Sequence, residues 1–246
     1  MKMNYKPAFR YQFSSFLKGS AVIYLILIVV VTGVLIGTMS ISKDSASTIS
    51  ITGFSITATI YLFVMGIVEI RNDLRLCLQC GVSRRTAFLS ELTAVLAASA
   101  ILAVAGELLT GIAQALAISN FNLFVADLYQ LIFVGSDVSS LTFSQHVLSA
   151  LFNTSLMFAA CVGGMFFSLM FWRLNRLWTI VVAISIPVLL NLVPNLLHWL
   201  NVDLTPFVNW ISSSIGCFLL FFLVLALLLG VFNWLLLRRA NIREAK

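Results

Sequence analysis

The side chains best suited to chemistry within an apolar setting lie near the middle of the chain. Glu107 falls inside a long apolar run, and Thr110 and Gln114 follow it at spacings that put all three on one face of a helix. An ionisable side chain in hydrocarbon must face protein or water. Two interpretations stay open: this face contacts a transported substrate, or Glu107 is a protonated or hydrogen-bonded residue that specifies helix packing.

A second group of candidate residues lies in the charged stretch 69–88. Ile70, Leu74 and Cys77 form an apolar stripe, which predicts an amphipathic helix. Gly81 is expected to end that helix as its C′ residue, and Ser83 is expected to cap the next one. The result is a short, rigid, charged elbow that suits docking to another protein. The alternative is that its arginines only hold the loop on one side of a membrane.

Motifs for nucleotide, metal or hydrolytic chemistry are missing from the sequence. It contains neither GxxxxGK[ST] nor HExxH, and His146 and His198 have no cysteine or acidic cluster beside them. Cys77 and Cys80 form a CxxC without a second pair, which favours ordinary packing over a zinc site. We therefore expect no catalytic residues, no metal and no cofactor in this chain.

The elements that must position these residues are membrane helices. Hydrophobic residues make up 61% of the 246 residues and charged residues only 10%, a balance that soluble domains do not show. Apolar runs of about 20 residues recur along the chain, and runs of that length form helices in a bilayer. We expect one all-α membrane domain over 1–246 with six spans, at 21–39, 51–68, 89–118, 147–172, 177–197 and 211–237.

The distribution of charge predicts the orientation of these spans. Of the 15 Lys and Arg residues, all but Lys43 fall before the first span, in 69–88, near 173–176 or after the last span. The segments between them hold Asp44, Asp127, Asp137 and Asp203. The positive-inside rule then places both termini in the cytoplasm of a multi-pass protein of the cell membrane. The basic pI reflects this orientation and not nucleic-acid binding.

The segments outside the spans carry amphipathic patterns of their own. Residues 1–19 repeat aromatic side chains at helical spacing, which predicts an interfacial helix with a bend at Gly19; a plain basic topology anchor is the alternative. The first span is not expected to be a secretory signal, because its apolar segment is too long and the stretch after it lacks a cleavage site. In the outer loop 119–146, Phe124, Leu128, Leu131 and Ile132 predict another surface helix.

One glycine pair in the first span permits close helix packing. Gly33 and Gly37 form a GxxxG motif. The pair is expected to contact either a second subunit or another helix of the same chain.

Three of these features together resemble the permease subunits of type 2 ABC transporters, which are small exporters with six spans and a separate ATPase. They are the amphipathic N-terminal segment, the Leu-x-x-Gly-Val-Ser-Arg-Arg-Thr-x-Phe pattern of 78–88 and the six spans with minimal loops. The likeness extends over the whole chain.

The resemblance implies a set of partners and contacts. The stretch 69–88 would hold the coupling helix that seats in the ATPase, and ATP and Mg would bind to that partner. The implied contact residues are Arg75, Gly81, Val82, Ser83, Arg84 and Arg85. A second permease copy or a sister permease would complete a two-fold unit surrounded by membrane lipids. The loop 195–210 is similar to the family's re-entrant hairpin.

Two other classes of function remain open from the sequence. An ATP-independent carrier or channel could use Glu107 to exchange a proton or cation. A membrane scaffold or immunity protein could bind a toxic peptide without moving it. The substrate, which a type 2 exporter could draw from peptides, lipids, drugs or ions, stays open, as does the direction of transport.

Overall fold

The computed structural model describes residues 5–41, 49–52, 54–117, 123–135, 141–174 and 205–238, together with three single residues between 181 and 192. These ranges are almost entirely helical. The helices are α1 (Tyr5–Ile41), α2 (Phe54–Gln79), α3 (Arg84–Ala117), the π-helical turn η1 (Gln130–Val134), α4 (Phe143–Arg173), α6 (Thr205–Ser213) and α7 (Ile215–Arg238).

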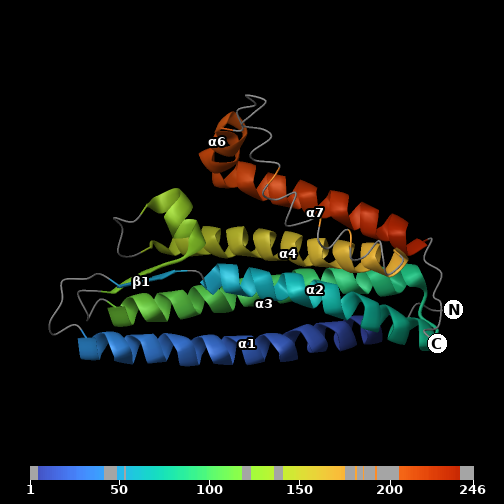
Figure 1. Ribbon diagram of the computed structural model, residues 1–246, viewed down its shortest axis with the longest axis horizontal. Helices are drawn as coiled ribbons and strands as arrows, with labels where there is room; N and C mark the ends of the chain where they lie inside the picture. The colour runs from blue at the N-terminus through green and yellow to red at the C-terminus, as the bar shows by residue number, and fades with distance from the viewer. Residues whose placement is uncertain are drawn as a thin grey trace.

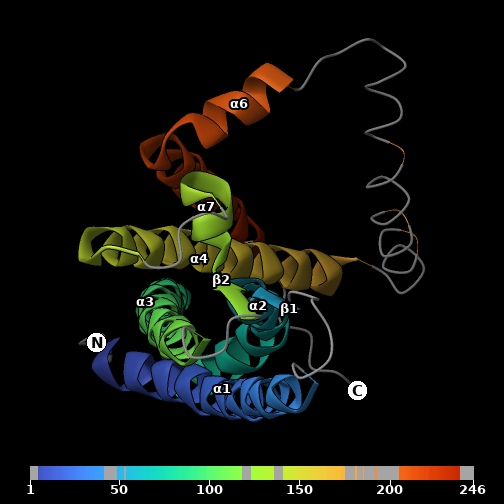
Figure 2. The same ribbon diagram turned by 90° about the vertical axis from the view of Figure 1, so that its left-hand side faces the viewer.

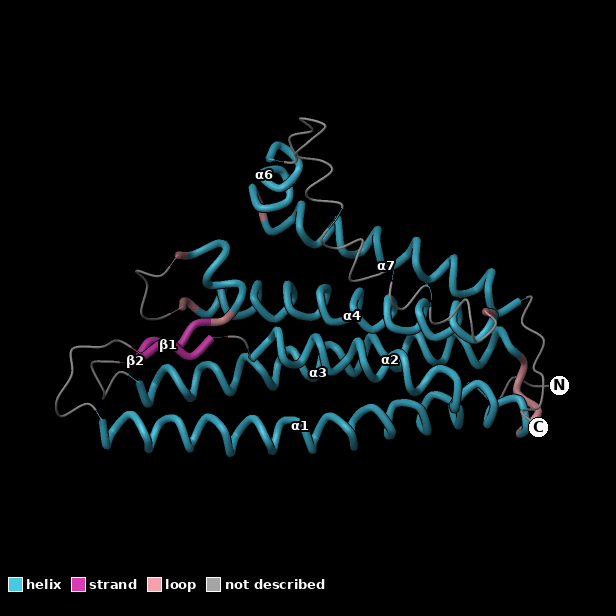
Figure 3. The backbone as a smooth tube through the Cα atoms, in the orientation of Figure 1, coloured by secondary structure: helices cyan, strands magenta, loops and turns pink. Residues whose placement is uncertain are grey.

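The long helices run side by side in layers (Figures 1 and 2). α2 and α3 form the middle layer, α1 packs on one side of it, and α4 packs on the other side. α7 lies on the outer side of α4 and carries the short α6 at its start. One end of the bundle holds the turn at 80–83 together with Arg173 and Arg238, and we name it the arginine end; β1 and β2 lie at the opposite end (Figure 3).

Five of the described helices are long and apolar enough to cross a membrane, which indicates a multi-pass membrane protein. These stretches are Tyr5–Gly33, Phe54–Gln79, Arg84–Ala115, Phe143–Arg173 and Ile215–Arg238. They overlap five of the six expected spans. The remaining one, 177–197, lies outside the described residues apart from three single positions.

The prediction of a separate interfacial helix over 1–19 is wrong for residues 5–19, which form the first part of α1. α1 continues through Gly19 without interruption. One reason is burial: Gln12 and Phe16 are fully buried against the bundle, so this face packs on protein and not on a membrane surface. Gly19 instead permits close packing, because a Cβ atom there would collide with the hydroxyl group of Tyr61.

The expected coupling helix within 69–88 is also not a separate element. α2 continues through this region to Gln79, and α3 begins at Arg84. The amphipathic stripe noted in the sequence is the continuation of the face that α2 already buries, since Ile70, Leu74 and Cys77 are all in the core. The helical period and the break at Gly81 are therefore as predicted, and the amphipathic piece is the end of α2.

At the opposite end, an all-helical fold is an incomplete description. β1 (Ile49–Thr52) pairs in parallel with β2 (Leu123–Ala126), in the register Ile49 to Leu123. Phe124, expected on a surface helix within 119–146, therefore lies in a strand. Leu131 and Ile132 do lie in a helical turn, η1, which ends at Gly135 with φ +89°. Of the loop 195–210, only the part from Thr205 onward is described, and it begins α6.

Two glycines set the distance between α2 and α4. A Cβ atom on Gly66 would collide with the carbonyl oxygen of Cys161, and one on Gly164 with that of Phe63. Ser168 Oγ donates to the Ile67 carbonyl at 2.6 Å across the same contact. Small residues permit this close approach of two backbones.

Candidate functional site

Six polar side chains from four parts of the chain converge inside the bundle near the opposite end. We name them the Glu107–Asp127 cluster. Ser55 comes from the first turn of α2, Glu107 from α3 and Asp127 from the residue after β2, while α4 supplies three side chains one turn apart. The members are Ser55, Glu107, Asp127, His146, Ser149 and Asn153.

Asn153 and Ser149 join the two carboxylates. Asn153 Nδ2 lies 2.6 Å from Asp127 Oδ2 and 3.2 Å from Glu107 Oε1. Ser149 donates its hydroxyl hydrogen to Glu107 Oε1, and its Oγ is 3.2 Å from Asp127 Oδ2. Ser55 donates to Asp127 Oδ1. A network with several donors is what buried carboxylates require, because an unpaired buried charge is costly.

Electrostatically, the cluster holds two acids and one base. Glu107 is 8% exposed and Asp127 is 1% exposed. His146 Nδ1 is 3.1 Å from Glu107 Oε2 and forms an ion pair with it when protonated. Burial raises the pKa of the nearby Tyr129, and the Glu107 carboxylate raises it further. The group can therefore hold a proton or a cationic ligand.

Thr110 and Gln114 lie on the same face of α3 as Glu107 but form hydrogen bonds outside the Glu107–Asp127 cluster. Thr110 is buried, and its hydroxyl donates to the Gly106 carbonyl of its own helix at 2.9 Å. Gln114 donates to the Val125 carbonyl at 3.1 Å and to Gln130 Oε1 at 2.9 Å. Gln114 therefore fastens β2 and η1 to the bundle, so its amide group is engaged within the chain.

Five members of the cluster, all except Glu107, were not found from the sequence as site residues. Asp127 was placed in an outer loop, yet β2 and η1 fold it back against α3 and α4. His146, Ser149 and Asn153 stand at i, i+3 and i+7, the same polar spacing that identified Glu107, Thr110 and Gln114. That pattern on the fourth span was the available signal.

A second group of buried acidic side chains lies toward the arginine end. Asp73 on α2 and Glu91 on α3 are 3% and 1% exposed. Glu69 accepts a hydrogen bond from Ser15 Oγ at 2.9 Å. Within the described part of the chain, Glu69 Oε2 and Gln12 Oε1 have no hydrogen-bond partner, whereas the carboxyl groups of Asp73 and Glu91 interact with each other. Glu107 is thus one of several buried acids in this bundle.

The elbow between α2 and α3 has the capping that its sequence predicts. Gly81 has φ +75°, its N–H bonds the Leu78 carbonyl at 3.0 Å, and the Val82 N–H bonds the Cys77 carbonyl at 2.9 Å. This is a Schellman motif with Gly81 at C′. Ser83 Oγ accepts the Thr86 N–H at 3.2 Å and caps α3.

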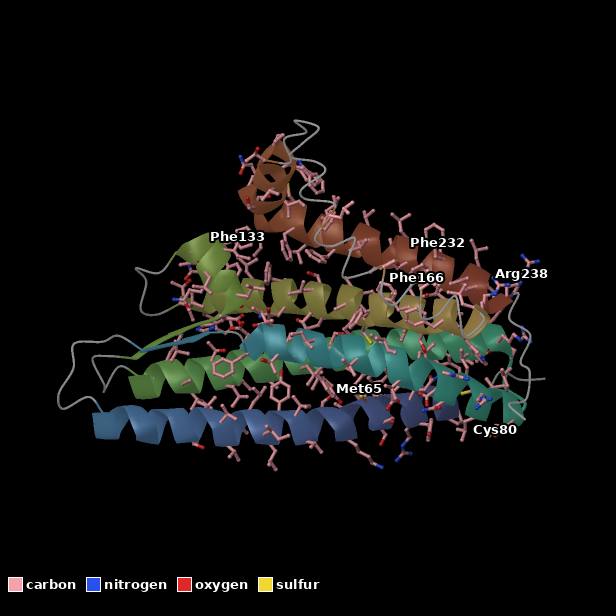
Figure 4. The ribbon with its side chains drawn as sticks, in the orientation of Figure 1. Met65, Cys80, Phe133, Phe166, Phe232 and Arg238 are labelled. Atoms are coloured by element: carbon pink, nitrogen blue, oxygen red, sulfur yellow. The ribbon has the colours of Figure 1, made fainter. Side chains whose placement is uncertain are left out.

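The tip of the elbow is open to solvent. Gln79, Cys80, Gly81 and Ser83 are exposed, whereas Val82 packs in part against the core. Figure 4 places Cys80 and Arg238 at the arginine end and Phe133 at the other. The exposed tip is therefore joined directly to two long helices, α2 and α3.

The arginines of the elbow are placed unequally with respect to this tip. Arg75 is half-buried one turn before the end of α2. Arg84 Nη1 lies 3.4 Å from the Leu237 carbonyl, and the guanidinium of Arg85 stands 5.8 Å from the ring centroid of Trp234. Arg84 and Arg85 therefore lie against α7, beside the elbow, while Gly81 and Ser83 form its outer edge.

The other positions noted in the sequence are the glycines of the GxxxG motif and the cysteines of the CxxC motif. Among the described residues, no atom beyond the local backbone of α1 lies within 4 Å of the Cβ position of Gly33, and the side-chain surroundings of Gly37 lie outside the described residues. Cys77 is buried and Cys80 is exposed, so the two thiols of the CxxC lie in different environments. Over the described ranges, no group of three or more His, Cys, Asp and Glu residues is placed to hold a metal ion.

A scan against protein-family models, a search of curated proteins and a search of solved structures found no match for this chain.

Proposed function

We propose that this chain is the membrane-spanning subunit of a type 2 ABC exporter, located in the cell membrane with the arginine end in the cytoplasm. In this proposal it moves a substrate across the membrane with energy from ATP that a separate subunit hydrolyses. The observation that carries the proposal is the elbow at 80–83, because it is exposed, capped on both sides and continuous with two spans.

The elbow supports the proposal through its mechanics. A flexible loop would absorb a displacement, whereas Gly81 and Ser83 fix the backbone between α2 and α3. A movement applied at Cys80 would reach the Glu107–Asp127 cluster through α3. The absence of a P-loop from the sequence requires the nucleotide, with its Mg, to bind to the partner.

The two-fold unit of such an exporter needs a second permease, either another copy or a sister chain. Gly33 supports a pairing surface on α1, because no residue that the structure describes on another element lies against it. Val22, Leu25 and Val29 on the same helix are exposed apolar side chains, which suit either lipid or a partner helix.

Copurification tests the proposed ATPase contact. The tagged chain is purified from its native membranes in mild detergent, and P-loop ATPases are quantified by mass spectrometry. We expect Gln79→Glu with Cys80→Glu to reduce the recovered ATPase at least tenfold, because two charges would enter the interface. Asn209→Glu, an exposed site on α6, should leave recovery unchanged. Equal recovery from all three proteins would contradict the proposed contact.

The arginines form a separate arm of the same experiment. Arg84→Glu with Arg85→Glu tests whether these side chains also touch the ATPase or act only against α7. Loss of ATPase with a folded permease supports their role as coupling residues, and full retention assigns the contact to the tip alone.

A second candidate function is an ATP-independent carrier, and one observation favours it: Glu107 pairs with a half-exposed His146 beside a second buried acid. Such a group can exchange a proton or cation. Proteoliposomes that contain this chain alone, with an imposed pH gradient, separate the two functions. Proton flux that Glu107→Gln abolishes would support the carrier, and its absence would favour the exporter.

A further inference from the structure

A groove at the arginine end has a mixed lining of one cation and three apolar side chains. It lies between the first two turns of α3 and the last turns of α7, and its volume is about 330 Å³. The lining residues in the described part of the chain are Arg85, Phe88, Leu89 and Trp234. None of its apolar members belongs to the Glu107–Asp127 cluster or to the tip of the elbow.

The lining places charge and apolar surface on different parts of the groove. The Arg85 side chain is exposed and stands over the Trp234 ring, 5.8 Å from its centroid. Phe88 is buried and packs against the same indole with 5.9 Å between centroids. Leu89, in contrast, is 51% exposed. A ligand here would meet a guanidinium at one end and an aromatic and aliphatic wall along its length.

The surroundings of the groove identify the kind of ligand. Val231 and Leu235 on α7 are 58% and 50% exposed, as expected for side chains against hydrocarbon. Arg238, in the last turn of α7, adds a second positive charge nearby. The groove thus lies where the lipid-facing surface meets the basic end of the bundle, at the level of lipid headgroups.

We propose that this groove is a binding site for an anionic phospholipid of the leaflet at the arginine end. The phosphate oxygens accept hydrogen bonds from the Arg85 guanidinium, whose planar donors suit phosphate. The upper part of an acyl chain lies along Phe88, Leu89 and Trp234. The bound lipid would brace the start of α3 against the end of α7, next to the elbow.

Lipid retention measures the proposal directly. The protein is reconstituted in nanodiscs that contain equal amounts of phosphatidylglycerol and phosphatidylcholine, released into mild detergent and examined by native mass spectrometry. We expect phosphatidylglycerol to be retained over phosphatidylcholine. Arg85→Gln should lower its retention about fivefold, since one basic residue near a membrane surface contributes on that order. Trp234→Leu should weaken retention of both lipids.

Arg71→Gln is the matched control. Arg71 also stands over an indole at the arginine end, 5.6 Å from the centroid of Trp172, but it does not line this groove. Its variant should keep wild-type retention. Equal losses in the Arg71 and Arg85 variants, or equal retention of both lipids by the wild type, would overturn the proposal. So would displacement of the lipid by inorganic phosphate, which would assign the site to a free anion. A thermal melt confirms that each variant is folded.

Discussion

At the residue scale, Asn153 is the side chain on which the Glu107–Asp127 cluster depends most. Its Nδ2 atom lies within hydrogen-bonding distance of both carboxylates, and no described residue donates a hydrogen bond to its own Oδ1. The amide therefore links the two carboxyl groups, and with them α3, α4 and the residue after β2. A carboxylate in its place would remove the donor and add a third acid.

We accordingly expect Asn153→Asp to lower the free energy of unfolding by about 3–5 kcal/mol, the usual cost of an uncompensated buried charge. The loss should be visible as a lower midpoint of thermal unfolding in detergent. Asn209→Asp makes the same chemical change on the exposed surface of α6 and should leave the midpoint unchanged. Similar midpoints for both variants would mean that Asn153 does not hold the cluster.

A second prediction at the residue scale uses Cys80 to test the orientation of the protein in the membrane. Cys80 is exposed, while Cys77 and Cys161 are buried. If the arginine end is cytoplasmic, a membrane-impermeant maleimide should label the protein in inverted vesicles and not in intact cells, and Cys80→Ser should remove most of that labelling. Labelling of Cys80 in intact cells would instead indicate that the arginine end faces the outside.

At the element scale, the contact between α2 and α4 is the tightest helix crossing that glycines define in the described chain. Gly66 and Gly164 each face a carbonyl oxygen of the other helix, so neither helix can shift without losing this fit. The sequence pattern pointed to Gly33 and Gly37 instead. A GxxxG spacing indicates that another helix can approach closely, but the sequence does not show which small residues form such a contact in the folded protein.

Gly164→Ala should therefore destabilise the protein by about 1–3 kcal/mol, as overpacking of a close contact does. Gly163→Ala, one residue earlier, meets only a Leu229 methyl group at 3.9 Å and should be tolerated. Thermal unfolding of the two variants side by side measures the difference. A melting midpoint for Gly164→Ala equal to that for Gly163→Ala would show that the helices can separate at little cost.

Local signals in the sequence predicted some elements well and others poorly. Gly81 and Ser83 were identified correctly, because a C′ glycine and an N-cap serine act within a few residues. The separate helix expected over 1–19 was wrong for residues 5–19, because the sequence does not show that the face carrying Phe16 is buried. The pairing of β1 with β2 joins residues more than 70 positions apart, as their register shows, and no local pattern reports it.

At the scale of the whole molecule, the candidate functional regions lie at different ends of the bundle. The Glu107–Asp127 cluster lies near the opposite end, while the elbow and the Arg85 groove lie at the arginine end. Glu107 was predicted from the sequence because it interrupts an apolar run. Its partner Asp127 was not, since only the folded loop brings it to α3. α3 joins both regions, and it is the element through which a load on the elbow would reach the cluster.

The proposed function requires a separate ATPase to bind the elbow, and a crosslink from the tip of the elbow tests this contact. A benzophenone maleimide is attached to Cys80 in inverted native vesicles and photolysed, and the adducts are identified by mass spectrometry. We predict an adduct with a P-loop ATPase whose yield changes when ATP is added, and none in the Cys80→Ser variant. If the tip forms no ATPase adduct in vesicles where the protein still transports its substrate, the proposed function is contradicted.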